Sequence, residues 1–304
     1  MNKKYNQEQI KEFISRSLFD EKILLNKNQS WPKISTVTPC FNTGRFLEKT
    51  ILSVLNQNYP NHEFIIIDGG STDGSLEIIK KYEKYLAFWV SEKDRGQSDA
   101  INKGFSMARG EIINVQETDD IFLPGAFYKI AELFRDNPDK DIIYGDRLDI
   151  DENDTIIRES KFIPFSLVVY QYDGMLLGPQ SAFWKRDLFS KIGMFNIDLH
   201  YTMDYDFFLK AAKTGVKFKY VPYFFSAMRR HSNSKTEKFL GTPSHQKELD
   251  VIDKKYGRKK WLNFPLKIYS LLHRSISYFL QGDLDYVLNG LKRRAKNKSI
   301  LSGR

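Results

Sequence analysis

The chain has 304 residues, 41% of them hydrophobic and 14% aromatic, which is long and apolar enough to bury a sizeable core. It carries a net charge of +9 and a single cysteine, Cys40, so an intrachain disulfide and any multi-cysteine metal site are excluded. The N-terminus is polar, and no apolar run approaches the roughly 18 residues of a membrane-spanning segment. We therefore expect a cytoplasmic globular protein.

The first half of the chain alternates between strand and helix patterns. Residues 1–30 form a polar leader with weak helical periodicity, and the core begins after it. Predicted strands, separated by apolar residues at helical spacing, cover residues 34–38, 64–67, 86–90 and 112–115. Pro39 is expected to stop the first of these strands. This alternation predicts βαβ units on a mainly parallel sheet, where ligands lie outside the carboxyl ends of the strands.

The second half of the chain is less regular. Residues 151–154 are typical of a hairpin turn, residues 182–184 of a short strand, and residues 204–211 of a helix. From about residue 243 to the end the pattern is helical, basic and rich in aromatic residues. We predict three parts: the leader 1–30, an α/β domain 31–240 and a basic helical extension 241–304.

An acidic cluster, Glu117-Thr118-Asp119-Asp120, follows the fourth predicted strand. Three carboxylates in four residues repel one another, so they are tolerable only in open water or around a cation. Hard oxygen donors suit Mg²⁺ or Mn²⁺, and Mg²⁺ usually takes one or two carboxylates together with substrate phosphate. The cluster therefore predicts a metal and diphosphate site. The alternative is a solvated acidic turn that caps the next helix.

Five motifs carry a family resemblance. They are Val37-Thr38-Pro39-Cys40-Phe41-Asn42, the run from Ile67 to Ser75 (IDGGSTDGS), the run from Asp94 to Gly104 (DRGQSDAINKG), Thr118-Asp119-Asp120, and Met203-Asp204-Tyr205-Asp206. In this order and spacing the sequence resembles the family 2 glycosyltransferases over residues 33–235. The resemblance implies the GT-A fold, a Rossmann-like, mainly parallel sheet flanked by helices, here with a C-terminal helical extension.

The resemblance also implies a role for individual residues in binding a nucleotide sugar. The nucleobase would be flanked by Thr38, Pro39 and Phe41, and Asp68 would accept its imide hydrogen. Asp94 and Arg95 would lie beside the nucleotide, and Asp119 near the ribose or the donor sugar. A divalent cation, Mn²⁺ or Mg²⁺, would be held by Asp120.

The catalytic base implied by the resemblance is Asp204, which would deprotonate the acceptor hydroxyl and invert the anomeric centre. The run Arg229-Arg230-His231 supplies two candidates for contact with the diphosphate, Arg230 and His231. Departures from the family pattern are Cys40 and Phe41, where Ser and Tyr are frequent, and Met203, where a Glu commonly precedes the base. The Phe41 ring can still stack on a base.

The implied reaction moves a sugar from a nucleotide-diphosphate sugar to a saccharide or lipid-linked acceptor in cell-surface polysaccharide or glycolipid synthesis. A sugar nucleotidyltransferase is the first rival, but it needs a Gly-rich basic loop after the first strand, and residues 39–45 hold one Gly and one Arg. A nucleic-acid-binding protein is the second, but residues 1–240 lack a recognisable motif, so no nucleic-acid partner is expected. A non-catalytic nucleotide-binding protein is the third, and the retained aspartates argue against it.

The C-terminal segment adds one further expectation. Apolar and aromatic residues interleave with Lys259, Lys260, Lys267 and Arg274, a pattern typical of a helix on an anionic membrane surface. The protein would then be peripheral on the inner face of the membrane. The alternative is a helix packed on the domain with its basic face in water. The sugar, the nucleotide and the acceptor stay open.

Overall fold

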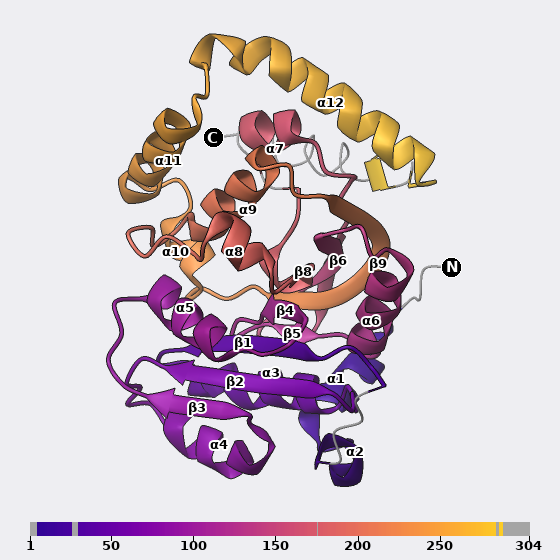
Figure 1. The fold of residues 1–304 in the computed structure, drawn as a ribbon, viewed down its shortest axis with the longest axis vertical. Helices are drawn as coiled ribbons and strands as arrows, with labels where there is room; N and C mark the ends of the chain where they lie inside the picture. Colours follow the sequence, from indigo (N-terminus) through magenta and orange to yellow (C-terminus); the bar gives the residue numbers. More distant parts are fainter. Residues whose placement is uncertain (1–4, 26–29, 175, 284–285, 288–304) are drawn as a thin grey trace, which may run out of the picture. The chain divides into compact units, whose positions relative to one another are not determined.

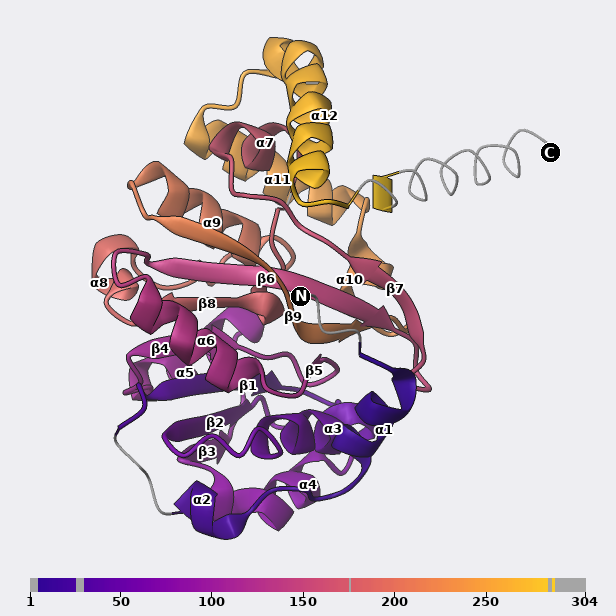
Figure 2. The same cartoon turned by 90° about the vertical axis from the view of Figure 1, so that its right-hand side faces the viewer.

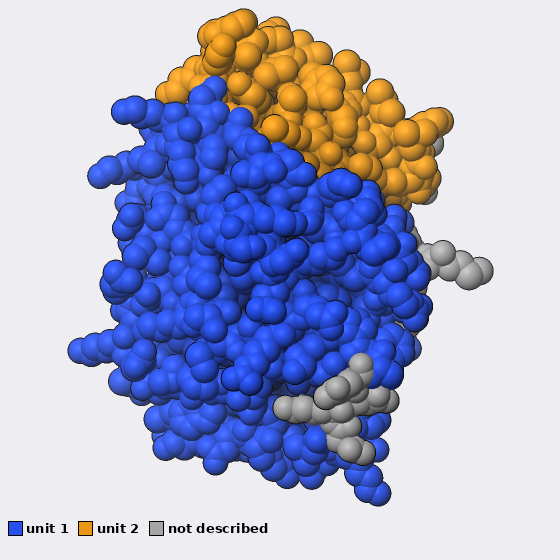
Figure 3. Space-filling view, viewed as in Figure 1, with its two compact units in different colours: residues 1–162, 177–257 blue, residues 163–176, 258–304 orange. Residues whose placement is uncertain are grey.

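The computed structural model describes residues 5–25, 30–174, 176–283 and 286–287 (Figure 1). Contacts divide the chain into two units, which Figure 3 distinguishes by colour. Unit 1 comprises residues 1–162 and 177–257, and unit 2 comprises residues 163–176 and 258–304. The division at residues 30 and 240 that we expect from the sequence stays a prediction.

A nine-stranded sheet forms the centre of unit 1 (Figures 1 and 2). Its first half runs in the order β3-β2-β1-β4 and is parallel throughout, as predicted; these strands are β1 (Ile34–Cys40), β2 (His62–Asp68), β3 (Phe88–Ser91) and β4 (Ile112–Val115). The sheet continues as β8-β6-β9-β5, with β7 paired to β6; these strands are β5 (Ile121–Phe122), β6 (Ile142–Ile150), β7 (Ile156–Ser160), β8 (Ala182–Lys185) and β9 (Phe218–Arg229). Since β8 is antiparallel to both β4 and β6, and β6 is parallel to β9, most of the sheet runs one way.

Helices cover both faces of this sheet. On one face, apolar residues of α3 (Gly44–Leu55), α4 (Ser75–Tyr82) and α6 (Ala126–Asp136) share a core with alternate residues of the strands, such as Phe64 and Ile66. On the other face, Trp184 of β8 packs against Phe105 of α5 (Gln97–Met107) and Phe207 of α9 (Met203–Lys213). The two cores explain why the central strands are apolar on both sides. The remaining helices of unit 1 are α1 (Gln7–Ser15), α2 (Glu21–Leu25), α8 (Leu188–Ile192), α10 (Lys235–Phe239) and α11 (Pro243–Tyr256).

The first strand is longer than predicted, because β1 continues through Pro39 to Cys40. Pairing with β4 ends at Val37, whereas pairing with β2 continues, with Pro39 opposite Ile67. Backbone groups of successive residues point to opposite sides of a strand, so those of Val37 and Pro39 point to the same side, and the Val37 carbonyl accepts a hydrogen bond on the β4 side. The missing N–H of Pro39 therefore faces the side without a neighbour and costs no hydrogen bond.

Helix α5 lies unusually close to the sheet, packed on β1 and β2. The close approach depends on Gly104, because a Cβ at this position would lie 2.3 Å from Cγ1 of Val37. A contact under about 3 Å cannot be accommodated without movement of the helix or the strand. The glycine in the middle of a helix is thus explained by packing, which outweighs its unfavourable helix propensity.

The N-terminal leader contains α1, which is part of unit 1. Its apolar stripe, Ile10, Phe13 and Ile14, is buried in a core shared with residues of β5, β6 and β9. The side chain of Asn56, just after α3, accepts a hydrogen bond from the Leu18 backbone and donates one to the Arg16 carbonyl at 3.0 Å. The weak helical periodicity expected from the sequence is therefore a genuine packing face.

Unit 2 pairs α7 (Leu167–Asp173) with α12 (Asn263–Leu280). The Asp173 carboxylate accepts hydrogen bonds from Ser270 Oγ at 2.6 Å and from Arg274 Nε at 2.8 Å. No helix in the described ranges is long and apolar enough to cross a membrane.

Candidate active site

The residues predicted to bind a donor gather at the carboxyl edge of the parallel strands. Phe41 directly follows β1, Asp68 ends β2, and Asp94 precedes the first turn of α5. The acidic cluster follows β4 and leads into β5. This edge is the place where ligands bind in open α/β sheets.

One end of the site is formed by Phe41, Gly69 and Asp94. The Phe41 side chain is 60% exposed although it is a large apolar ring. A Cβ built on Gly69 would lie 2.5 Å from Oδ2 of Asp94 and 3.3 Å from Cδ2 of Phe41, so all three residues are in close contact. The Asp94 Oδ1 atom accepts a hydrogen bond from the Gly96 N–H at 2.8 Å, and no hydrogen bond from the described residues reaches Oδ2. A carboxylate oxygen is therefore available beside an exposed ring.

Asp68 has a different environment, since it is completely buried. Its Oδ2 atom accepts hydrogen bonds from the Gly70 and Ser71 N–H groups at 3.1 and 2.9 Å and from Ser91 Oγ at 2.6 Å, while Oδ1 accepts one from Ser71 Oγ. Burial alone would raise the pKa of Asp68, but the hydrogen bonds from Ser71 and Ser91 outweigh it and lower the pKa. Asp68 thus fastens the turn after β2 to the end of β3.

Thr38 and Pro39 are also buried within β1, and Phe41 is exposed beyond them. The Thr38 Oγ1 atom has no hydrogen-bond partner among the described residues. Of the three residues predicted to flank a nucleobase, Phe41 offers a surface.

The other end of the site is the acidic cluster. Asp120 is buried, and its carboxylate accepts hydrogen bonds from the Arg229 N–H at 2.8 Å and from Gln180 Nε2 at 3.0 Å. Burial, followed by the charge of Asp119, raises the pKa of Asp120 well above its usual range. The Asp119 Oδ2 atom lies 2.9 Å from Nε2 of His231. The sequence-predicted His231 is therefore brought to the cluster.

Glu117 is a member of the cluster to which the sequence assigned no individual role. Its Oε2 atom accepts a hydrogen bond from Gln97 Nε2 at 2.6 Å. Burial, followed by the negative charges of Asp119 and Asp204, raises the pKa of Glu117 to about 8, although Lys235 and the hydrogen bond from Gln97 oppose the rise. Because Glu117 senses both aspartates, the cluster and the start of α9 belong to one electrostatic site.

Asp204 lies in the first turn of α9, where Oδ1 accepts a hydrogen bond from the Tyr205 N–H at 2.7 Å. Burial raises the pKa of Asp204, while that hydrogen bond and the positive charges of Lys235 and Arg147 oppose the rise. The nearby Asp206 is turned away, because its Oδ1 atom accepts hydrogen bonds from Lys255 Nζ at 2.8 Å and Tyr256 at 2.9 Å.

A lysine near these carboxylates was not predicted from the sequence. Lys235 Nζ donates hydrogen bonds to Gln97 Oε1 and to the His200 carbonyl. Burial lowers the pKa of Lys235, and the charges of Glu117 and Asp204 act against that shift. Its position four residues after His231 is the only signal for it in the sequence.

The predicted arginines are engaged elsewhere. Arg230 forms ion pairs with Asp149 at 3.3 Å and Glu237 at 2.9 Å. The exposed Arg95 lies 3.4 Å from Asp99. Arg229 is fully buried, donates to the Asp119 carbonyl and stacks its guanidinium on the Phe46 ring at 4.8 Å. Arg229 therefore holds the backbone of the acidic cluster in place.

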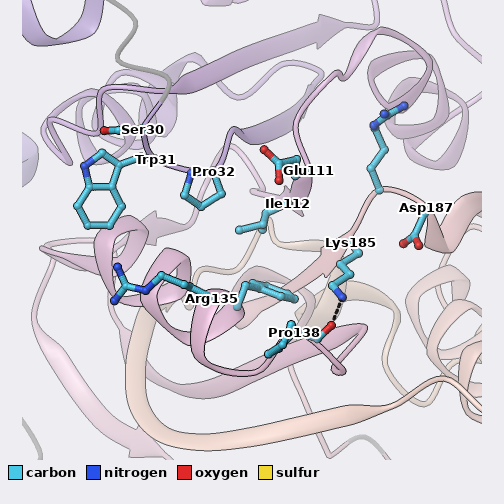
Figure 4. A pocket seen from close by; sticks show the side chains of 11 residues that line it. Ser30, Trp31, Pro32, Glu111, Ile112, Arg135, Pro138, Lys185 and Asp187 are labelled. Carbon is cyan, nitrogen blue, oxygen red and sulfur yellow. Dashed lines mark hydrogen bonds between the residues drawn. The ribbon is translucent and has the colours of Figure 1, made fainter.

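A pocket of about 640 Å³ lies at the opposite end of the strands (Figure 4). It is lined near the amino ends of β1 and β4 by Trp31, Pro32 and Ile112, together with charged residues such as Arg135 and Lys185. Lys185 Nζ donates to the Pro138 carbonyl there. None of the predicted donor-binding residues lines this pocket, so we place the candidate site at the carboxyl edge.

The chain matches the family model described as glycosyl transferase family 2 over residues 35–235. An uncharacterized glycosyltransferase of Mycobacterium tuberculosis is 31% identical over 185 residues, which cover 60% of this chain and 70% of that protein. A poly-beta-1,6-N-acetyl-D-glucosamine synthase of Staphylococcus epidermidis is 32% identical over 129 residues, which cover 41% of this chain and 31% of that protein.

Two solved structures are similar in fold. The structure of S. aureus TarS 1-349 in complex with UDP-GlcNAc gives a TM-score of 0.61 at 19% identity, covering 77% of this chain and 69% of that one. The mannosyltransferase PcManGT from Pyrobaculum calidifontis, in complex with GDP-Man and Mn²⁺, gives 0.52 at 14% identity, covering 89% and 82%. The fold, the order of the motifs and the family match agree, and the chain is a glycosyltransferase that belongs to glycosyl transferase family 2, with a GT-A fold.

Proposed function

We propose that this glycosyltransferase moves a sugar from a nucleoside-diphosphate sugar to an acceptor hydroxyl with inversion, in the synthesis of a cell-surface polysaccharide or glycolipid. The observation that carries the proposal is that Glu117 lies within reach of the charges of both Asp119 and Asp204, at the same edge of the sheet as the exposed ring of Phe41. Support comes from the neighbours solved with UDP-GlcNAc and GDP-Man, and from a similar putative teichuronic acid biosynthesis glycosyltransferase of Bacillus subtilis. Family membership argues against the nucleotidyltransferase and nucleic-acid-binding alternatives.

In this proposal the nucleobase stacks on Phe41 and is read by Asp94. A flat heteroaromatic ring on the exposed face of Phe41 presents its edge to the available Oδ2 atom of Asp94. Asp68 is expected from the family resemblance to accept the imide hydrogen, but its carboxylate is buried and already accepts four hydrogen bonds. We therefore transfer this role to Asp94, and assign Asp68 to holding the turn.

The donor set fits a divalent cation. Within the described residues no three His, Cys, Asp or Glu side chains are grouped so that they could hold a metal ion alone. Mg²⁺ and Mn²⁺ at phosphate sites need only one or two carboxylates, and a buried acid among like charges is costly without a cation. Asp120 would hold the ion, with Asp119 beside it. When bound, the ion neutralises charge on the departing diphosphate.

The protein's own residues supply the remaining steps. His231 and Lys235 lie among the carboxylates, where they can donate hydrogen bonds to the diphosphate oxygens. Asp204 takes the proton of the acceptor hydroxyl, and its raised pKa brings it closer to the pH at which a general base works best. A base on the face opposite the leaving group gives inversion.

The test is a screen of the purified chain with nucleoside diphosphates and nucleotide sugars in the presence of Mn²⁺, followed by transfer assays with saccharide and lipid-linked acceptors. A nucleotide that binds the folded state raises the unfolding temperature. We expect at least one nucleoside diphosphate to do so, and transfer from its sugar to give a product of inverted anomeric configuration. A product of retained configuration would contradict the proposed role of Asp204, and no response to any nucleotide would contradict the donor class.

A further inference from the structure

Helix α12 presents its apolar side chains to the outside. Phe264, Ile268, Leu272 and Ile276 recur every four residues, and Phe279 continues the stripe. Their exposed fractions range from 47% for Ile268 to 77% for Phe264. A stripe of large apolar side chains this exposed is costly in water unless something covers it.

The opposite side of the same helix is its packed side, and it is polar. Ser270 is completely buried and, together with Arg274, bonds to Asp173 of α7. Tyr278 is the other buried residue of the helix. An ordinary surface helix buries its apolar stripe and exposes its polar face. Helix α12 does the opposite, because it buries polar side chains and exposes its apolar stripe.

The charge of the chain is concentrated in the same unit. Residues 258–304 hold 11 Lys and Arg against 2 Asp, which leaves 36 basic and 36 acidic residues in positions 1–257. The entire net charge of +9 is therefore carried by the last 47 residues. Three of these basic residues, Lys259, Lys260 and Lys267, are exposed beside the stripe.

We propose that α12 lies flat on an anionic lipid surface, with its apolar stripe among the acyl chains and the basic residues at the headgroups. Apolar burial and attraction to anionic lipid act together on such helices. A second copy of the chain is a poorer occupant, because it would bring a second strongly basic segment against the first. The proposal concerns attachment and is independent of the donor chemistry.

The test uses the full chain and two kinds of vesicle. The neutral vesicles are pure phosphatidylcholine, and the anionic vesicles are phosphatidylcholine with about 30% phosphatidylglycerol. We expect co-sedimentation with the anionic vesicles in about 0.1 M salt, at least tenfold weaker binding to the neutral ones, and loss of binding in about 0.5 M salt. Trp261, which is 74% exposed, should shift its fluorescence to the blue on binding, and Trp261→Phe should remove that shift.

The deciding variant replaces Ile268, Leu272 and Ile276 together by Gln. These side chains are exposed, so the fold should be retained, and binding should fall more than tenfold. The matched control replaces two exposed leucines of unit 1, Leu25 and Leu240, by Gln in the same way. This control should bind the vesicles as the wild type does. Equal binding of the triple variant and wild type, or no binding to anionic vesicles, would overturn the proposal. So would concentration-dependent dimers in light scattering that the triple variant abolishes.

Discussion

Two aspartates at the ends of neighbouring sequence motifs differ in what their carboxylates touch. Asp68 is buried and accepts four hydrogen bonds, whereas Asp94 keeps one oxygen available next to the Phe41 ring. A carboxylate whose acceptor positions are filled stabilises the fold, and one with a position open can bind a ligand. The assignment of roles therefore depends on hydrogen bonds more than on motif position.

The first prediction concerns Asp94. Asp94→Asn should weaken binding of the preferred nucleoside diphosphate by about 10- to 100-fold, because a charge-assisted hydrogen bond to the N–H edge of uracil or guanine is lost. Discrimination against CDP and ADP, whose bases present a ring nitrogen acceptor at that edge, should fall with it. Calorimetric titration with UDP, GDP, CDP and ADP measures both the loss of affinity and the loss of discrimination.

Two comparison variants separate recognition from folding. Gly69→Ala should act like Asp94→Asn, since the added methyl group would displace the Asp94 carboxylate. Asp68→Asn should lower stability by about 1–3 kcal/mol and leave discrimination intact. Lost discrimination in Asp68→Asn alone would return the base-reading role to Asp68.

The second prediction concerns the proposed catalytic base, Asp204. Asp204→Asn should lower kcat by about 10²–10⁴-fold with donor affinity nearly unchanged, because the amide is isosteric but cannot take the proton. The exposed Asp198 in the segment before α9 provides the control, and Asp198→Asn should leave kcat unchanged. Retention of more than about a tenth of kcat in Asp204→Asn would move the role to another group. Glu117 would be the next candidate, because Asp206 is held by Lys255 and Tyr256.

At the scale of secondary-structure elements, α1 shows how a segment that looks peripheral in sequence can support the site. It packs beside β5, the strand that directly follows the acidic cluster. Ile10 and Ile14 are essentially without exposed surface. The loss of α1 would therefore uncover the core next to Asp120.

The third prediction follows from that packing. Ile10→Ala should lower the free energy of unfolding by about 2–4 kcal/mol, because it removes buried methyl groups and leaves a cavity. Leu18→Ala, at a residue of the same leader that is 43% exposed, should change it by less than about 0.5 kcal/mol. Urea unfolding curves of the two variants decide the matter, and equal effects would mean that α1 is not part of the cooperative unit.

The start of β2 gives the fourth prediction, on pH. His62 lies against the rings of Phe64 and Phe127, and burial lowers its pKa to about 3 from the ordinary value of 6.5. As the pH falls, His62 is therefore protonated in the unfolded chain before it is protonated in the folded one. The stability that depends on a neutral His62 is fully present above pH 6.5 and is lost as the pH falls below it.

His62→Phe keeps an aromatic ring that does not titrate. Between pH 6.5 and 5, wild type should lose about 2 kcal/mol of stability relative to this variant. Denaturant unfolding at several pH values measures the difference. Parallel pH profiles for the two proteins would show that His62 is protonated as easily in the folded state as in the unfolded one.

Sequence patterns predicted the elements whose signal is local. The apolar run of β2, the helix at α9 and the β6–β7 hairpin all lie where expected. The second half of the sheet was not predictable, because β6 pairs in parallel with β9 about 75 residues later through a register with two irregularities. Pro39 was misread because its effect depends on where β4 stops pairing.

The same division applies to the site. Asp119, Asp120 and Asp204 are recognisable from motifs, and in the structure the charges of Asp119 and Asp204 both act on Glu117. The contacts of Gln97 with Glu117 and Lys235 join three separate elements, so no local pattern reports them. Burial, which separates Asp68 from Asp94, is likewise a property of the folded chain.

At the scale of the whole molecule, the acidic cluster concentrates carboxylates whose mutual repulsion a bound cation would relieve. Burial, followed by the charge of Asp119, raises the pKa of both Glu117 and Asp120. Binding of a cation and nucleotide should therefore stabilise unit 1 as a whole.

The fifth prediction is that Mn²⁺ and the preferred nucleoside diphosphate together raise the unfolding temperature, by an amount corresponding to about 2.7 kcal/mol at a hundredfold excess over Kd. The chelator EDTA should abolish this gain, and Asp120→Ala should show little of it. Asp139→Ala, at an exposed acid away from the site, serves as the control. Tight binding that ignores both EDTA and the Asp120 substitution would contradict the metal site.

The contact between Gly104 and Val37 gives α5 a mechanical role. The helix can approach β1 this closely because residue 104 has a hydrogen atom in place of a side chain. The N-terminal end of the same helix begins at Gln97, directly after the Asp94 loop. A methyl group at residue 104 would push this part of α5 away from β1 and so displace the N-terminal end of the helix. A residue about two helical turns from Gln97 thus helps to fix the position of the helix end that follows Asp94.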